Sequence, residues 1–192
     1  ADCLALSEAV DGAGKDYKSV FAVILGTGVG AGYSINKEII VGPNKLTGEW
    51  GQNPIPGPMD DYEKSVKRHC GRVGAIEVFL SGPGLENYYE FISKAKKTSR
   101  EIVSLYQEGD PVAIEVMNVY FERIARAFSS FVNILDPDVI VCGGGMSEID
   151  DIYNEIPTRI IPYIASNFFL TPIIKATHGS SSGVRGAAHL WN

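Results

Sequence analysis

The segment Phe21–Gly32, FAVILGTGVGAG, constrains the fold most, because an apolar run passes directly into a turn with glycine at every second position. The β-branched and aromatic residues of Val20–Leu25, cut at once by Gly26, predict a buried strand. Glycine has no Cβ and admits positive φ, so the backbone after this strand can turn sharply and present several N–H groups to an anion. Ala31–Val41 predicts a second strand, so the motif is a strand–loop–strand hairpin.

This hairpin differs from two familiar nucleotide-binding motifs. It lacks the Gly-Lys-Ser/Thr ending of a P-loop, and its glycines open no helix as those of a dinucleotide-binding fingerprint do. Two interpretations of the residues stay open at this point. One is a phosphate-binding loop in which Thr27 adds a hydroxyl donor, and the other is an ordinary glycine-rich turn.

Composition limits the classes of function that the chain can serve. With 192 residues, 45% hydrophobic and 21% charged, the chain suits one domain with a sizeable core. A net charge of −6 argues against nucleic-acid binding, which needs clustered Lys and Arg. No apolar run approaches the length of a membrane span. Cys3, Cys70 and Cys142 form no even-numbered disulfide framework, so we expect a reducing cytoplasm.

The pattern along the chain predicts the order helix, hairpin, long loop, helices, strand, helix, strand, helix. Asp110-Pro111 is a helix start, with an N-cap and then proline at the first helical position. The expected helices are Leu4–Val10, Ala75 or Ile76 to Leu80, a stretch through Leu85 and Ile92, Thr98–Glu108, Pro111–Leu135, one capped by Ser147 and broken or restarted at Pro157, and Val184–Trp191 after Ser181. The expected later strands are Asp138–Cys142 and Pro172–Thr177.

These elements predict an α/β fold with a mixed sheet. Strands that alternate with helices require parallel pairing through crossover helices, whereas the hairpin supplies antiparallel strands. The helix Pro111–Leu135 carries an apolar stripe that includes Met117, Phe121 and Phe128. That stripe suits packing into the core, and a homodimer surface is the alternative.

Six motifs in order resemble the ROK family, named for repressors, open reading frames and sugar kinases, with its bacterial mannokinase/fructokinase branch the nearest match. They are CLALSEAVDGA at 3–13, FAVILGTGVGAG at 21–32, TGEWGQNPIP at 47–56, CGRVGAIEVFLSGPG at 70–84, ILDPDVIVCGGG at 134–145 and SSGVRGAAHLW at 181–191. The resemblance implies an actin-like ATPase (ribonuclease H-like) fold of two lobes, with nucleotide and sugar between them. Residues 1–192 would be the C-terminal lobe alone, with the N-terminal lobe absent.

The resemblance also implies roles for residues of this chain. ATP would be bound by Gly26, Thr27, Gly28, Gly30, Gly143, Gly144 and Gly145, and the sugar by Glu49, Gln52 and Glu77. The catalytic base would be an Asp just upstream of Ala1, so no catalytic residue falls in the chain. If the resemblance is set aside, the residues Gly143–Gly145 indicate only a plain strand-to-helix turn. In the same way, Glu49 is a solvated loop residue and Glu77 is a carboxylate in the first turn of a helix.

The chain departs from the family at its structural zinc. Relatives bind zinc with one His and three Cys, whereas Gln52, Arg68 and Ala75 stand at the His, first Cys and last Cys positions, and Cys70 alone remains. Tetrahedral zinc needs four ligands, so we predict no structural zinc. Gln52 would meet the sugar through an amide in place of the imidazole.

The resemblance favours an ATP-dependent hexose kinase of fructokinase, mannokinase or glucokinase type, acting with ATP and Mg²⁺ on a hexose. A sugar-sensing domain of a ROK-type transcriptional repressor is the first alternative, and a non-catalytic sensor or interaction domain the second. The isolated C-terminal lobe is expected to be inactive. We expect a cytoplasmic protein whose partners are ATP and a hexose, with a homodimer as an open alternative and with no nucleic acid or membrane bound by this lobe.

Overall fold

The computed structural model describes residues 1–179 and 182–189, and in these residues five strands form one sheet of order β3-β2-β1-β4-β5. The strands are β1 (Ser19–Leu25), β2 (Val29–Ile35), β3 (Glu38–Ile39), β4 (Val139–Gly143) and β5 (Ile173–Lys175). β1 pairs antiparallel with β2 and parallel with β4, which in turn pairs parallel with β5. The predicted mixed sheet, with an N-terminal hairpin and crossover helices, is confirmed.

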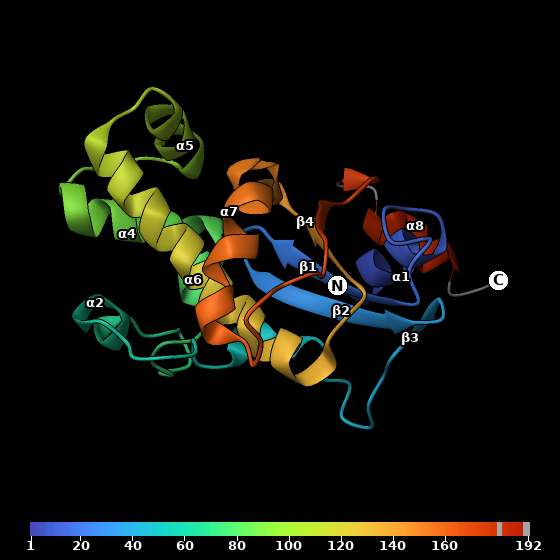
Figure 1. Ribbon diagram of the computed structural model, residues 1–192. Helices are drawn as coiled ribbons and strands as arrows, with labels where there is room; N and C mark the ends of the chain where they lie inside the picture. The colour runs from blue at the N-terminus through green and yellow to red at the C-terminus, as the bar shows by residue number, and fades with distance from the viewer. Residues whose placement is uncertain (180–181, 190–192) are drawn as a thin grey trace.

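The sheet separates two layers of helices. Successive side chains of a strand point to opposite faces, so Phe21, Val23 and Leu25 join the large core cluster, whereas Val20 and Ala22 join a smaller one beneath α1 (Asp2–Val10). Figure 1 shows α1 and α8 (Ser182–His189) together on one side of the sheet, with α6 (Pro111–Leu135) and α7 (Asp151–Arg159) on the other.

α6 has the predicted bounds because its ends are fixed locally. The Asp110 carboxylate accepts a hydrogen bond from Ala113 N at 2.8 Å, Pro111 follows the cap, and Asp136 ends the helix with a φ of +41°. The predicted stripe is buried, with Met117, Phe121, Ile124, Phe128 and Phe131 all at most 4% exposed. The stripe therefore packs in the core of this chain.

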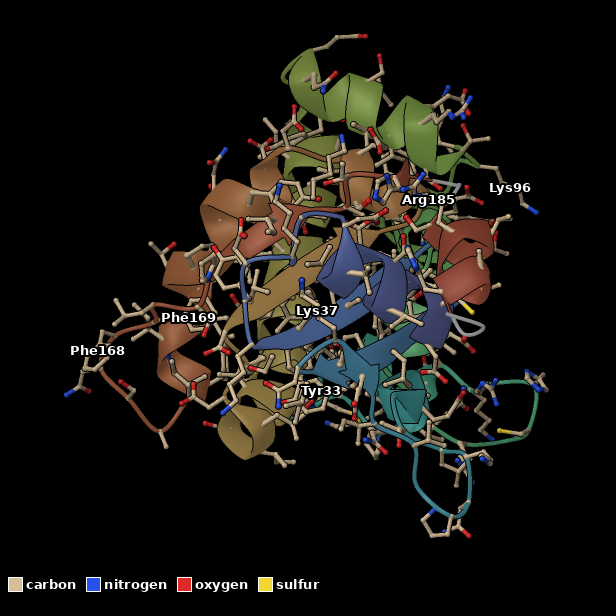
Figure 2. All side chains as sticks on the ribbon, turned by 90° about the vertical axis from the view of Figure 1, so that its right-hand side faces the viewer. Tyr33, Lys37, Lys96, Phe168, Phe169 and Arg185 are labelled. Carbon is tan, nitrogen blue, oxygen red and sulfur yellow. The ribbon has the colours of Figure 1, made fainter. Side chains whose placement is uncertain are left out.

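The predicted strand Ala31–Val41 is wrong in its length, because a tight turn divides it. Asn36 and Lys37 have φ of +53° and +66°, the left-handed pair that a two-residue hairpin turn needs. β2 therefore ends at Ile35, and β3 pairs back on it through Ile39 opposite Ser34. Asn tolerates this conformation, but Lys rarely adopts it, which hid the turn from the sequence. Lys37 is labelled in Figure 2.

Ser147 does not cap a helix as predicted. It lies inside η2 (Gly145–Glu148), where its hydroxyl donates to Gly144 O at 2.6 Å, and α7 begins only at Asp151. Pro157 lies inside α7 without ending it, since the helix runs on to Arg159 before η3 (Ile161–Tyr163). Serine competes for nearby backbone groups as readily in a 3₁₀ turn as at a helix start.

The long loop after the hairpin holds three short helices, η1 (Glu49–Gln52), α2 (Asp61–Ser65) and α3 (Glu77–Leu80). A buried charge cluster attaches this loop to α6. Glu63 is 1% exposed and accepts hydrogen bonds from Arg123 Nε at 2.9 Å and from Arg126 Nη1 at 3.0 Å. The Arg123 guanidinium also lies 4.1 Å from the ring centre of Tyr88, in α4 (Gly82–Ser93).

The remaining helices lie at the two ends of the molecule. α5 (Ser99–Gln107) follows α4 and packs with it against α6. At the other end, Arg185 of α8, labelled in Figure 2, pairs with Asp11 just after α1. The sequence predicted a terminal helix over Val184–Trp191, preceded by Ser181. Three of these residues, Ser181, Leu190 and Trp191, lie outside the described residues. No described helix is both long and apolar enough to span a membrane.

Candidate functional site

Two glycine turns meet at one edge of the sheet. β1 and β4 are parallel neighbours with Ile24 opposite Gly143, so the turn after each strand emerges at the same edge. Ligands of open α/β sheets bind in the crevice outside the carboxyl ends of such strands. The Gly26–Gly28 loop and the Gly143–Gly145 turn therefore converge although well over a hundred residues separate them.

A cleft of about 580 Å³ opens at this edge. Gly26 and Thr27 line it from the hairpin, and Gly145 lines it from the second turn. Its other lining residues come from α4, α5 and the segment of η2: Gly82, Pro83, Glu86, Ser99, Arg100, Val103, Ser104, Gln107, Met146, Glu148 and Ile149. The volume and the mixture of apolar and polar groups suit a small-molecule ligand.

The glycine loop is held in place by the start of α4. Gly26 N donates to Gly28 O at 3.0 Å, which closes the loop, and Gly82 N donates to Gly26 O at 2.8 Å. The Ser81 hydroxyl caps α4 by accepting from Gly84 N at 3.2 Å. The positive end of the dipole of a three-turn helix thus lies beside the loop, an arrangement that favours phosphate groups.

Gly144, in the second turn, is a position that only glycine fits. Its φ is +91°, and a Cβ built there would lie 2.4 Å from the carbonyl oxygen of Leu25. The second turn therefore passes directly over the end of β1. Gly145 differs, because a Cβ there meets nothing within 4 Å, so this residue leaves its side of the cleft open.

Several polar side chains on the cleft wall are held in place by hydrogen bonds and an ion pair. Glu86 Oε1 accepts from Ser99 N at 2.8 Å and from Ser99 Oγ at 2.7 Å, which joins α4 to the first turn of α5. Glu148 pairs with Lys175 at 2.6 Å at the opposite rim. Arg100 lines the cleft and is solvent-exposed.

Sequence reasoning missed most of this wall. Gly82 and Pro83 fell within a motif that supported the resemblance, but the helix predicted over Thr98–Glu108, which is α5, was assigned to no site. Its cleft-facing residues Ser99, Arg100 and Gln107 carry no motif, so nothing in the sequence marked them.

Gly30 and Gly32 of β2 point to one face of the sheet, because alternate residues of a strand point the same way, and Gly28 lies in the turn just before this strand. A Cβ on Gly28 would lie 3.0 Å from Glu77 Oε2, and one on Gly32 would lie 2.8 Å from Ala1 O. Of the predicted phosphate-binding residues, Gly26 and Thr27 line the cleft, whereas Gly28 and Gly30 are not in its lining. Gly143 and Gly144 line a smaller hollow that shares Gly145 with the cleft. Glu77 thus lies close to the turn before β2, whereas the start of α1 lies close to the strand itself.

Glu77 lies against the glycine loop. It is the first residue of α3, its Oε2 accepts from Val29 N at 3.2 Å, and its Oε1 accepts from Arg68 Nε at 3.0 Å. The side chain retains about 24% of its exposure. One predicted sugar ligand is thus placed beside the predicted phosphate loop.

Glu49 and Gln52 lie together on η1, which packs on β2. Gly48 O accepts from Ala31 N at 2.9 Å, and a Cβ on Gly51 would lie 2.3 Å from Val29 O. Both polar residues line a second hollow of about 540 Å³, which Asn53 and Arg72 also line. Glu77 does not appear in the described lining of this second hollow. Glu49 and Gln52 therefore lie together, whereas Glu77 lies apart from them, beside the glycine loop.

The residues at the family's zinc positions do not fit a zinc ion. Arg68 is a cation already paired with Glu77, and Ala75 is buried with no ligand atom on its side chain. Cys70 is free and exposed. Arg68, Ala75 and Cys70 therefore do not supply the ligand set of a structural zinc.

The fold and the convergent glycine turns define an actin-like ATPase lobe of α/β type. The ROK family model matches residues 1–192, and this chain belongs to the ROK family. Among curated relatives, the N-acetyl-D-glucosamine kinase of Vibrio atlanticus is 40% identical over 194 residues, which cover 99% of this chain. The chain spans 64% of that relative's length.

Solved structures share the fold. A ROK hexokinase from Thermus thermophilus superposes with a TM-score of 0.85 at 25% identity, over 98% of this chain and 61% of its own. A ROK family glucokinase from Streptomyces griseus, in complex with glucose and AMPPNP, also has a TM-score of 0.85, at 22% identity over 99% of this chain and 65% of its own. At that identity the second likeness shows the fold alone.

Proposed function

We propose that this chain is the C-terminal lobe of an ATP-dependent hexose kinase. The observation that carries the proposal is the cleft in which the β1 and β4 glycine turns meet the start of α4, with the Glu77 carboxylate against the same loop. A kinase needs a nucleotide site and a hydroxyl-binding carboxylate side by side, and the nearness of the cleft and the Glu77 carboxylate supports this proposal.

The nucleotide would lie across the two glycine turns. We assign the phosphates to the turn of Gly26, Thr27, Gly28 and Gly30, in which the Thr27 hydroxyl and the N–H groups of Thr27 and Gly28 would be the donors, because the Gly26 N–H already closes the turn. The nucleoside is assigned to Gly143–Gly145. Backbone donors beside a helix N-terminus stabilise the charge that develops on a transferring phosphoryl group. Mg²⁺ would arrive with ATP and shield its phosphates. In this proposal Gly30 contributes to the phosphate site from within β2, although it does not line the cleft.

The sugar would be held by Glu49, Gln52 and Glu77. A carboxylate accepts hydrogen bonds from sugar hydroxyls and discriminates sharply against a sugar that lacks the matching hydroxyl. Gln52 can both donate and accept through its amide.

The base would be an Asp just before Ala1. Ala1 lies against Gly32 of β2, so a residue preceding it would start beside the hairpin that carries the glycine loop. The base would take the proton of one sugar hydroxyl as that oxygen attacks the γ-phosphorus and ADP leaves. By this proposal the lobe alone, lacking the base, turns over no substrate.

The particular hexose is part of the proposal. The motifs suggested fructose, mannose or glucose, whereas the curated relative described above is named for N-acetyl-D-glucosamine. We therefore propose a hexose or N-acetylhexosamine and place N-acetyl-D-glucosamine first among the sugars to test. A cytoplasmic setting and a homodimer belong to the same proposal, and the three free cysteines support the first.

The test is ADP release by the complete gene product with ATP and Mg²⁺, over N-acetyl-D-glucosamine, glucose, mannose, fructose and N-acetylmannosamine. Turnover on one sugar, absent without sugar and lost in the Glu77→Gln variant, is the expected result. A folded protein silent on every sugar would overturn the kinase and favour the repressor. In that case a helix-turn-helix would be encoded upstream in place of a second lobe.

A further inference from the structure

Arg68 lies on a tight turn that fixes where its side chain can reach. Arg68 N donates to Arg72 O and Gly71 N donates to Arg68 O, both at 2.8 Å, and Lys67 pairs with Val73 below the turn. Gly71 takes a φ of +83° at the tip. This small hairpin projects from the long loop and points the Arg68 side chain at the start of α3.

The Glu77 carboxylate is held at both of its oxygens. Arg68 Nε donates to Oε1 at 3.0 Å, and Val29 N donates to Oε2 at 3.2 Å. The two charged side chains retain only 19% and 24% of their exposure. An ion pair so shielded from solvent is screened less than a surface pair. The orientation of the Glu77 carboxylate is therefore set by two donors, Arg68 Nε from the long loop and Val29 N from the β1–β2 hairpin.

We propose that Arg68 is a positioning residue for sugar binding, which holds the Glu77 carboxylate in the orientation that accepts the sugar hydroxyls. The inference rests on the proposed kinase function, in which Glu77 is a sugar ligand. Arg68 need not touch the sugar. Its effect passes through Glu77, whose two oxygens each keep a further lone pair after the contacts with Arg68 and Val29.

The energetic reason is preorganisation. A glutamate side chain rotates about three bonds and loses that freedom when it binds a ligand in one orientation. Arg68 restricts the Glu77 side chain before the sugar binds, so sugar binding loses less conformational entropy and the affinity is higher. The planar guanidinium does this better than a lysine ammonium, because it donates along a fixed direction.

The test compares steady-state kinetics of Arg68→Met, Arg68→Lys and the control Lys67→Met in the complete gene product. Lys67 is exposed on the same turn, so its variant removes the same charge without a contact to Glu77. For Arg68→Met we expect the KM for the sugar to rise about tenfold, with kcat and the KM for ATP within about twofold of the unaltered protein. Arg68→Lys should recover part of the loss, and Lys67→Met should change nothing.

A double-mutant cycle separates positioning from a general effect on the fold. In the Glu77→Gln background, Arg68→Met should raise the KM for the sugar much less than it does alone, since its partner charge is already gone. Sugar binding measured by calorimetry replaces KM if the Glu77→Gln protein does not turn over.

Each outcome decides the matter. An unchanged sugar KM in Arg68→Met overturns the inference and leaves the kinase proposal standing. Additive effects with Glu77→Gln, or a parallel loss of ATP affinity and thermal stability that Arg68→Lys does not restore, assign Arg68 a structural role and also overturn it. An unaltered protein that phosphorylates no sugar overturns the kinase proposal and this inference with it.

Discussion

The backbone N–H of Gly82 donates to the carbonyl oxygen of Gly26 at 2.8 Å, which attaches the first residue of α4 to the glycine loop after β1. The bond spans two elements that lie far apart in sequence and fixes the loop against a helix N-terminus. A phosphate bound at this loop would meet backbone donors that are already in place, with little reorganisation left to the moment of binding.

Gly144→Ala should lower the free energy of unfolding by about 2–4 kcal/mol, because the new Cβ meets Leu25 O in a left-handed backbone conformation. Chemical denaturation measures the change. Gly145→Ala is the matched stability control, since a Cβ there is free of contacts within 4 Å. Equal stabilities for the two variants would contradict the close approach of this turn to β1.

Gly145→Leu should weaken nucleotide binding about tenfold or more without lowering the melting temperature. Gly145 lines the cleft and a Cβ there meets nothing within 4 Å, so we expect the leucine side chain to fill cleft space without a clash at its Cβ. Calorimetric titration with a non-hydrolysable ATP analogue checks this prediction. Retained affinity would place the nucleotide elsewhere than in this cleft.

Glu63→Gln should destabilise the protein by about 3–5 kcal/mol, because it leaves Arg123 and Arg126 buried beside a neutral amide. Lys64→Met, one residue away on the exposed face of α2, should change stability by less than about 0.5 kcal/mol. Urea unfolding of both variants gives the comparison. A loss no larger than that of the control would show that the cluster does not hold the loop to α6.

The cysteines should react at different rates with a thiol reagent. A hydrogen bond from the Arg72 backbone and the neighbouring Arg68 guanidinium lower the pKa of Cys70, which is exposed, whereas burial raises the pKa of Cys142 to about 12. Since the thiolate is the nucleophile, Cys70 should react fast and keep reacting as the pH falls toward neutral. Cys142 should react only on unfolding. Cys70→Ser should abolish the fast phase, and its persistence would assign that phase to Cys3.

Glu101 should contribute a pH-dependent share of the stability of α5. Hydrogen bonds from the backbone and hydroxyl of Thr98, and then from Lys97, lower the pKa of Glu101 from an ordinary 4.5 to about 2. A lowered folded-state pKa gives stability that is present above pH 4.5 and is lost as the pH falls toward 2. The difference in melting temperature between the protein and its Glu101→Gln variant should therefore shrink over that window. A constant difference would show that the hydrogen bonds of Glu101 with Thr98 do not stabilise α5.

Much of the fold could be predicted from the sequence because its determinants are local. Asp110-Pro111 fixed the start of α6, and the run Val20–Leu25 before Gly26 fixed β1. Caps, prolines and period-2 apolar runs act within a few residues, so they are visible in the sequence. Asn36-Lys37 and Ser147 were misjudged where the same local chemistry serves two structures.

The candidate site was predictable only in part. Gly26, Thr27 and Gly145 were expected to act together, and the cleft joins them. The contribution of α5 was not expected, nor was the bond between Arg68 and Glu77. These features depend on which elements pack together, and no short-range pattern encodes that.

Most elements, the family and the residue types available for chemistry could thus be read from the sequence. Which of these residues meet depends on the folded chain: parallel pairing of β1 with β4 brings two glycine turns to one edge, and the long loop brings Arg68 to the Glu77 carboxylate. The difference lies in the distance along the chain over which each interaction acts. Backbone propensities act over a few residues, whereas a binding site is made by long-range packing of surfaces that the chain brings together only when it folds.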